Sequence, residues 1–378
     1  MRVLGLTARD FRGYHELHAS FGAGLTVVAG PNGAGKTNLL EALYLGCTGR
    51  SCRTSNDREL VRFGASVARV VVETEGEDGR HELSVGVAPG QPKAMRVDGA
   101  QVQRLLDVEH RPLVGVFLPD RLDLIKGPPA LRRAHLDQVI AALWPARVAT
   151  RRTYAQALAQ RNALIGRIRS GQSPSTSLTT WDLQLARSGI ALMEDRRRAI
   201  AALSELFEEL SGQLGLDGEP SLGYRPRSRA TEPAELASEL ADRTHGDLER
   251  GFTGHGPHRD EISILRVGRE LRTYGSGGQQ RLALLALLLS ERAAIAGVRS
   301  SAPLMLLDDV MSELDGSRRT ALVELLGNGG QSVITATELE QVPRSGQPNV
   351  VRLEVCAGRV RLDASSGSGC SSAELSVG

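Results

Sequence analysis

An eight-residue segment near the N-terminus, GPNGAGKT at residues 30–37, carries the residue types that bind phosphate groups. Its glycines let a backbone wrap around an anion, and the N–H groups of the loop and of a following helix receive the negative charge. Lys36 at this spacing reaches the β- and γ-phosphates of a nucleotide, and the Thr37 hydroxyl ligates Mg²⁺. An apolar run at 24–30 and an amphipathic run at 37–46 supply the strand–loop–helix context that makes the pattern specific. The predicted ATP-binding residues are Gly30, Pro31, Asn32, Gly33, Ala34, Gly35, Lys36 and Thr37.

Two adjacent acids end a second apolar run, PLMLLDD at residues 303–309. At the end of a strand near a phosphate loop, Asp308 is predicted to coordinate Mg²⁺ together with Thr37. Asp309 is predicted to orient or deprotonate the water that attacks the γ-phosphate. The alternative is an ordinary buried strand whose acids begin a turn. The phosphate loop in the same chain favours catalytic roles for Asp309 and Lys36.

A second glycine-rich turn precedes a long run of helix-forming residues. It consists of Ser276, Gly277, Gly278 and Gln279. Adjacent glycines at such a junction present backbone N–H groups and a helix N-terminus to an anion. Taken alone, the pattern is more typical of a helix that Ser276 caps.

The composition indicates a soluble, cytoplasmic protein. The chain has 378 residues, 41% hydrophobic content and a formal net charge of +2, so a DNA-binding surface has to be a local patch. No apolar stretch is long enough for a membrane span, and no signal-peptide pattern opens the chain. The four cysteines form no CxxC pair, which argues against a thiolate metal site.

The elements that position these motifs alternate along the chain. Residues 1–126 have mixed strand and helix patterns, and residues 127–245 have long helical patterns. The mixed pattern returns at 246–362, and a Ser/Gly-rich tail occupies 363–378. We therefore expect an ATPase head in two sequence segments with a helical domain inserted between them.

A basic stretch lies inside the helical region. Residues 146–169 contain six arginines and no acids, and Arg147, Arg151, Arg152 and Arg161 are predicted to contact DNA phosphates. Such contacts give salt-sensitive binding that does not depend on base sequence. The alternative is a solvated helix face without a partner.

The order of phosphate loop, SGGQ turn and Asp-Asp strand end resembles that of ABC-type ATPases. The whole chain apart from its tail is similar to the RecF recombination-mediator family, with FRGY at 11–14 and TGHGPHRDEI at 253–262 as further matching motifs. The resemblance implies an α/β fold, an ABC-type P-loop ATPase head of mixed sheets flanked by helices with a helical second domain. It also implies a homodimer that forms on ATP, in which the SGGQ signature of one subunit contacts the ATP of the other.

The resemblance further implies partners and an activity. Members of the family bind single- and double-stranded DNA, act with RecO and RecR to place the RecA recombinase on single-stranded gaps, and have weak, DNA-stimulated ATPase activity. An ABC transporter ATPase subunit remains the alternative function. A GTPase is disfavoured because no NKxD base-reading motif is present.

Several positions depart from the pattern of related ATPases. Gly13 replaces a common asparagine, and Asp120 lies where related ATPases place a glutamine. Thr335 or Thr337 occupies the region of the usual switch histidine, which suggests slow hydrolysis. His258 is either catalytic, DNA-facing or held in a structural turn.

Overall fold

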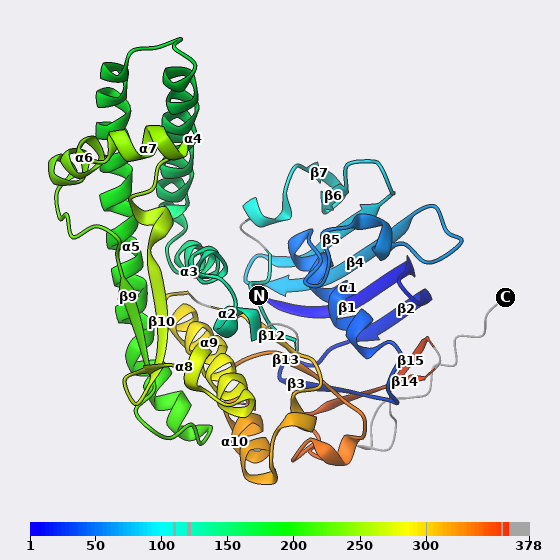
Figure 1. Cartoon of the computed structure of the whole chain (residues 1–378). Coiled ribbons are helices and arrows are strands. Elements are labelled where there is room, and N and C mark those ends of the chain that lie inside the picture. Colours follow the sequence, from blue (N-terminus) through cyan, green and yellow to red (C-terminus); the bar gives the residue numbers. More distant parts are fainter. Residues whose placement is uncertain (109–110, 119–121, 300, 328, 357, 363–378) are drawn as a thin grey trace. The chain divides into compact units, whose positions relative to one another are not determined.

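Figure 1 shows the computed structural model of the chain, which describes residues 1–362 except 109–110, 119–121, 300, 328 and 357. The chain divides into two compact units. The first unit comprises Met1–Pro119 and Ser301–Gly378, and the second comprises Asp120–Ser300. Asp120 and the expected tail at 363–378 lie outside the described residues. Among the described residues, no helix combines the length and the apolar character needed to cross a membrane.

The first unit contains a six-stranded antiparallel sheet in the order β2-β1-β4-β5-β6-β7, blue to cyan in Figure 1. Its strands are β1 (Arg2–Phe11), β2 (Tyr14–Ser20), β4 (Ala68–Gly76), β5 (Gly79–Val87), β6 (Ala94–Val97) and β7 (Ala100–Val102). Buried and exposed residues alternate along β4, as expected for a sheet with one face on the core and one toward water. Strands β4 and β5 are adjacent in sequence and pair as an antiparallel hairpin.

A second six-stranded sheet has the order β15-β14-β3-β13-β12-β8. Its strands are β3 (Leu25–Ala29), β8 (Val114–Phe117), β12 (Leu304–Leu307), β13 (Ser332–Ala336), β14 (Val351–Cys356) and β15 (Arg359–Leu362). All neighbours are parallel except β14 and β15. Strand β3, which leads into the phosphate loop, and β12, which ends in the two acids, lie on either side of β13. The carboxyl ends of all three strands therefore meet at one edge of the sheet.

Helix α1 (Lys36–Thr48) follows the phosphate loop and contributes to the core shared by both sheets. Leu39, Leu40 and Leu43 are fully buried in it. The same core contains Val70 and Val72 of β4. The remaining helical segments of this unit are η1 (Asp57–Leu60), η2 (Leu105–Asp107), η7 (Val310–Glu313), α10 (Gly316–Gly327) and η8 (Leu339–Gln341). Because α1 is buried on nearly every side, the loop that precedes it has a fixed base.

The second unit is mainly helical. Its helices are α2 (Asp123–Lys126), α3 (Pro129–Leu143), η4 (Pro145–Arg147), α4 (Val148–Arg169), η5 (Ser175–Ser177), α5 (Leu178–Gln213), α6 (Pro233–Asp242), α7 (Thr244–Arg250), η6 (Pro257–Arg259), α8 (Leu271–Tyr274) and α9 (Gly277–Val298). Helix α5 is its longest element and packs against α4, α6 and α9. A three-stranded sheet in the order β11-β10-β9 completes the unit, with β9 (Ser221–Arg225), β10 (Glu261–Arg266) and β11 (Arg269–Glu270).

The extent of the second unit differs from the expected helical insertion at 127–245. The unit reaches from 120 to 300, so residues 246–300 of the expected C-terminal head segment pack with it. Two long-range pairings cause this difference: β10 pairs with β9, and α9 packs on α5. The helical periodicity of the sequence cannot predict either pairing, because each pairing joins segments that are far apart in sequence.

Candidate nucleotide-binding site

The phosphate loop between β3 and α1 depends on glycine at two positions. A Cβ atom at Gly30 would lie 2.2 Å from the carbonyl oxygen of Val355, and a Cβ at Gly35 would lie 2.8 Å from the hydroxyl of Tyr14. Gly35 also has a φ of 115°, in the region that side chains rarely adopt. These residues therefore fix the loop shape that GPNGAGKT predicts.

Lys36 lies within this loop. Its Nζ donates hydrogen bonds to the carbonyl oxygens of Gly30 and Pro31, at 2.6 and 3.0 Å. Burial lowers the pKa of Lys36, and the nearby carboxylates of Asp309 and Asp308 oppose that shift. The ammonium group is therefore held where a phosphate chain inside the loop would replace or share its carbonyl partners.

Thr37 and Asp308 meet although they are 271 positions apart in sequence. The Thr37 hydroxyl donates to Oδ2 of Asp308 at 2.7 Å, and the Thr335 hydroxyl donates to Oδ1 of the same carboxylate at 2.7 Å. Thr335 lies on β13, the strand between the other two. Both carboxylate oxygens are thus oriented by hydroxyl groups, and the oxygens of Thr37 and Asp308 converge beside the loop.

Asp309 directly follows Asp308 and is the N-cap residue of η7. Its backbone φ is 45°, in the left-handed region, and its N–H donates to the hydroxyl of Thr335 at 2.8 Å. Within the described part of the chain, its Oδ1 atom is buried without a hydrogen-bond partner. A carboxylate oxygen in this condition is suited to accept a hydrogen bond from a water molecule.

The FRGY segment supports the loop from the side of β1 and β2. The Tyr14 hydroxyl donates to the carbonyl of Gly35 at 3.1 Å. The Arg12 guanidinium makes two hydrogen bonds to the carboxylate of Glu41 on α1, at 2.8 and 2.9 Å. Glu41 is fully buried, so this bidentate pair fixes α1 and the loop before it.

The SGGQ turn lies in the second unit, at the start of α9. Ser276 caps the helix, since its side chain accepts from the N–H of Gln279, and the Gln279 side chain accepts in return from the N–H of Ser276. Gly277 and Gly278 are exposed, and a Cβ at either position would have no neighbouring atom within 4 Å. The structural cap expected for Ser276 is confirmed. Packing among the described residues requires neither glycine, which leaves room for an external contact.

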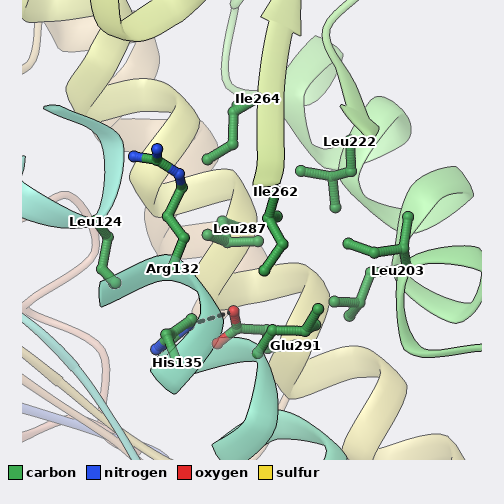
Figure 2. Close-up of a pocket in the computed structure, with 11 residues that line it drawn as sticks. Leu124, Arg132, His135, Leu203, Leu222, Ile262, Ile264, Leu287 and Glu291 are labelled. Atoms are coloured by element: carbon green, nitrogen blue, oxygen red, sulfur yellow. Dashed lines mark hydrogen bonds and ion pairs between the residues drawn. The ribbon is translucent and has the colours of Figure 1, made fainter. Parts of the chain in front are cut away.

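Helix α9 is firmly held behind this turn. Figure 2 shows an apolar pocket in the second unit, where Leu287 of α9 faces Ile262 of β10 and Leu203 of α5. At its edge, Glu291 of α9 pairs with His135 of α3, with 2.6 Å between Oε1 and Nε2. The lining is mostly leucine and isoleucine, which suits packing and provides no cradle for phosphate groups. The turn is therefore presented by a rigid helix.

Comparison with known proteins identifies the family. The sequence profile of the RecF/RecN/SMC N terminal domain matches residues 2–354. The DNA replication and repair protein RecF of Myxococcus xanthus is 35% identical over 376 residues, which cover 96% of this chain and 98% of the relative. The chain belongs to the RecF family. A RecF protein of Anaeromyxobacter sp. is 36% identical and covers 95% of this chain and 99% of its own length.

Solved structures agree with this assignment. A RecF-ATP structure, described as the recombination mediator protein of the RecFOR pathway, has a TM-score of 0.83 at 27% identity and covers 96% of this chain and 97% of its own. An Smc head bound to the C-winged helix domain of ScpA shares the fold, with a TM-score of 0.59 at 17% identity, 96% of this chain and 98% of its own. The expected α/β ATPase head with mixed sheets flanked by helices is confirmed.

One of the expected DNA contacts in this RecF chain is wrong. Arg161 is fully buried, and its guanidinium donates to Asp182 and Asp247 at 2.7 Å each and to the Thr253 hydroxyl at 2.8 Å. It joins α4, α5 and α7 inside the second unit. A buried guanidinium with two carboxylate partners cannot reach a DNA phosphate. The number of charges along the helix does not reveal this burial, because the acidic partners of Arg161 come from other elements.

The other three arginines are exposed. Arg147 ends η4, and Arg151 and Arg152 lie in the first turns of α4. Arg147 lies 3.6 Å from Asp195, and Arg151 lies 3.5 Å from Asp137, yet the two side chains remain 47% and 53% exposed. Arg152 makes no ion pair among the described residues. These three side chains can still reach phosphates, so their proposed DNA contacts stay predictions.

His258 of the GPHRDE motif has a structural environment. Its Nε2–H donates to the carbonyl of Thr253 at 2.9 Å, so Nδ1 accepts from the Tyr154 hydroxyl at 2.7 Å. Burial lowers the pKa of His258 to about 4, which keeps the ring neutral at physiological pH. The structural alternative thus accounts for all of its polar atoms.

Proposed function

We propose that this RecF chain is an ATP-gated DNA-binding protein of recombinational and replication-gap repair. The observation that carries the proposal is the meeting of Thr37, Asp308 and Thr335 beside a glycine loop that already encloses Lys36. This arrangement contains the groups that a nucleoside triphosphate site requires. The family relatives, named DNA replication and repair proteins, support the DNA-associated role over that of a transporter subunit.

The residues present fit a magnesium ion bound with the nucleotide. The candidate ligands are the Thr37 hydroxyl and the Asp308 carboxylate, which are hard oxygen donors 2.7 Å apart. When bound, Mg²⁺ would neutralise developing charge on the β- and γ-phosphate oxygens. The backbone N–H groups of the loop and Lys36 would hold the phosphates. Asp309 would orient the attacking water or accept its proton.

ATP binding would act as a switch through a second copy of the chain. In the proposed dimer, Ser276, Gly277, Gly278 and Gln279 of one subunit contact the ATP held by Gly30–Thr37 of the other. The free glycines and the rigid cap of α9 support this role. ATP then shifts the population toward a closed dimer that binds DNA, and slow hydrolysis releases it.

We further propose that the closed dimer clamps DNA near single-strand/double-strand junctions in the cytoplasm. With RecO and RecR it would help load RecA on the adjoining single strand. The support is family membership and the RecFOR pathway named for the RecF-ATP structure. The weak ATPase activity would be stimulated by DNA and would act as a timer.

Lys36→Met tests the proposed function. The variant loses the charge that would contact the phosphates, and we expect ATP affinity to fall roughly 10- to 100-fold. ATP-dependent dimerisation and DNA binding should then disappear at nucleotide concentrations that saturate the wild type. Nucleotide titration, light scattering and DNA-binding assays, each with and without ATP, measure the three effects.

Lys126→Met is the matched control, because Lys126 is exposed on α2 and distant in sequence from the loop. It should bind ATP and DNA as the wild type does. Lys36→Arg keeps the charge, but a planar guanidinium fits poorly in a site made for a compact ammonium group, so it should be impaired as well. Wild-type ATP-dependent behaviour of Lys36→Met would refute the proposal.

DNA affinity should fall steeply with salt if the exposed arginines of α4 neutralise phosphates. Replacing Arg147, Arg151 and Arg152 with alanine should reduce the slope of log affinity against log salt by about two to three units on duplex DNA. Binding isotherms at several salt concentrations give this slope. An unchanged slope would show that these three arginines form a solvated helix face without a DNA partner.

A further inference from the structure

Phe63 is exposed to a degree that is unusual for an aromatic side chain. It is 99% exposed, whereas Phe11, Tyr14, Phe21 and Phe117 of the same unit are buried. The chain has six phenylalanines, and the next most exposed, Phe252, is 40% exposed. Val67, four residues later, is 50% exposed. Covering a fully exposed phenyl ring removes apolar area from water, so binding of a partner on this ring is favourable.

The turn that carries Phe63 is well anchored. Ala65 N–H donates to the Arg62 carbonyl, and Gly64 has a φ of 85°, which gives Phe63 the second position of a β-turn. At the base of the turn, the Arg62 N–H donates to the carbonyl of Asp10, and the Arg62 side chain pairs with the Asp10 carboxylate at 2.7 Å. The ring is therefore displayed by a fixed turn, which reduces the entropy cost of binding a partner.

Unpaired positive charge lies next to this turn. Arg9 and Arg69 are exposed and stand directly opposite each other on β1 and β4. Neither they nor the exposed Arg58 of η1 makes an ion pair within the described residues. Like charges directly opposite each other are unfavourable, and the acid in the same row, Glu16 of β2, lies opposite Arg9 on the side away from Arg69. A phosphate bound at Arg69 would therefore reduce the repulsion between the two arginines.

Most acids of the same region have basic partners. Asp10 pairs with Arg62, Asp57 with Lys93, and Glu59 with Arg12. Glu16 of β2 lies opposite Arg9 and within 3.1 Å of the His18 ring. Because Arg9, Arg58 and Arg69 outnumber this acid, the net charge left for an outside partner is positive.

The sheet surface beside these arginines is shallow. Arg69 is opposite Gly86 on β5, and Gly86 is opposite Ala94 on β6. A row of two arginines thus continues into two positions with almost no side chain. An extended phosphate backbone can lie against such a surface without steric obstruction.

We propose that Phe63 stacks on an unpaired DNA base while Arg9 and Arg69 bind the phosphates beside it. This surface, named here the Phe63 patch, consists of Arg9, Arg58, Phe63, Val67 and Arg69. Phenyl rings stack on bases of any sequence, and stacking requires a base that is free of its duplex neighbours. The patch therefore selects single-stranded DNA or the unpaired side of a junction. The inference rests on the proposed DNA-binding function and specifies which DNA structure this surface reads.

The test compares Phe63→Ala with wild type on three DNAs: a single strand, a duplex with a single-stranded overhang, and a blunt duplex. Loss of stacking should weaken binding to the first two roughly tenfold and leave the blunt duplex unchanged. A 2-aminopurine base in the single strand should be quenched by the wild type and not by Phe63→Ala. Phe63→Tyr keeps a stacking ring and should restore both readouts.

Leu362→Ala is the matched control, because Leu362 is an apolar side chain of the same unit, 63% exposed, on the other sheet. It should behave as the wild type. The double variant Arg9→Ala/Arg69→Ala should reduce the salt slope on single strands by about one unit. Circular dichroism and thermal melting check that each variant is folded.

Each result has a defined meaning. If Phe63→Ala binds all three DNAs as the wild type does, the inference is overturned and the ATP-gated function stays intact. A protein would then be the better occupant of the Phe63 patch. Equal losses on all three DNAs would also overturn it, since a blunt duplex offers no free base. If the wild type binds none of the DNAs, with or without ATP, the proposed function fails and the inference fails with it.

Discussion

Asp309→Asn is expected to slow ATP hydrolysis about 100-fold or more while ATP and Mg²⁺ still bind, since general base catalysis contributes on this scale. Asparagine has nearly the size of aspartate, so the left-handed backbone and the bond from its N–H to Thr335 can be retained. The lost property is the carboxylate whose Oδ1 has no partner among the described residues. The closed dimer should persist after ATP is added. Single-turnover phosphate release and sizing over time measure both effects.

Asp308→Asn should behave differently. Asp308 accepts from Thr37 and Thr335, so its replacement removes a candidate Mg²⁺ ligand and disturbs Thr37. We expect a higher Mg²⁺ requirement for nucleotide binding. If Asp308→Asn and Asp309→Asn both show the magnesium dependence and the ATP turnover of the wild type, the two acids do not divide their roles in this way.

Ser276→Arg is expected to abolish ATP-induced dimerisation and the DNA binding that depends on it. The exposed Ser276 is at the N-terminus of α9, so an arginine places a bulky side chain in the proposed contact with the other subunit's ATP. ATP binding by the monomer should remain normal because Gly30–Thr37 is unchanged. Loss of the Ser276 cap lowers the free energy of unfolding by about 1 kcal/mol, so the variant should stay folded. Nucleotide titration and light scattering test these expectations.

Mixing Ser276→Arg with Lys36→Met distinguishes contacts between subunits from contacts within one chain. In a mixed dimer that uses the contacts between subunits, one site has both defects and the other has an intact loop and an intact signature. The mixture should therefore recover one site per dimer at most, with partial ATP-dependent closure. Loss of ATP binding in the Ser276→Arg monomer, with no recovery on mixing, would show that the turn serves its own chain.

The phosphate loop could be predicted from sequence because its determinants are local. An apolar strand, a glycine loop and a helix that begins at Lys36 occupy 24 consecutive residues, 25–48, and each is favoured by its own residues. The cap of α9 was equally readable, since Ser276 and Gln279 are three positions apart. The long helical patterns expected within 127–245 include α5 (Leu178–Gln213), because the spacing of apolar residues directly reports the helical period.

Long-range pairing decided the rest of the fold and the site. From the sequence, Thr335 and Thr337 were both candidates for the position of the usual switch histidine. Only the insertion of β13 between β3 and β12 brings Thr335 to the Asp308 carboxylate. The pairing of β10 with β9 likewise moved residues after 245 into the second unit. Such pairings depend on which strands become neighbours, and a local pattern contains no record of that choice.

The sequence by itself determined that the chain has a glycine phosphate loop, a strand-end acid pair and a capped SGGQ helix, because each is a short-range pattern of residue types. The tertiary structure alone decided which charges remain available. Arg161 looked like Arg152 in sequence, but Asp182 and Asp247 from two other helices enclose it. Phe63 has a residue type that is usually buried, but its turn holds it in solvent. Burial depends on what the rest of the chain places around a side chain, so residue type and spacing cannot supply it.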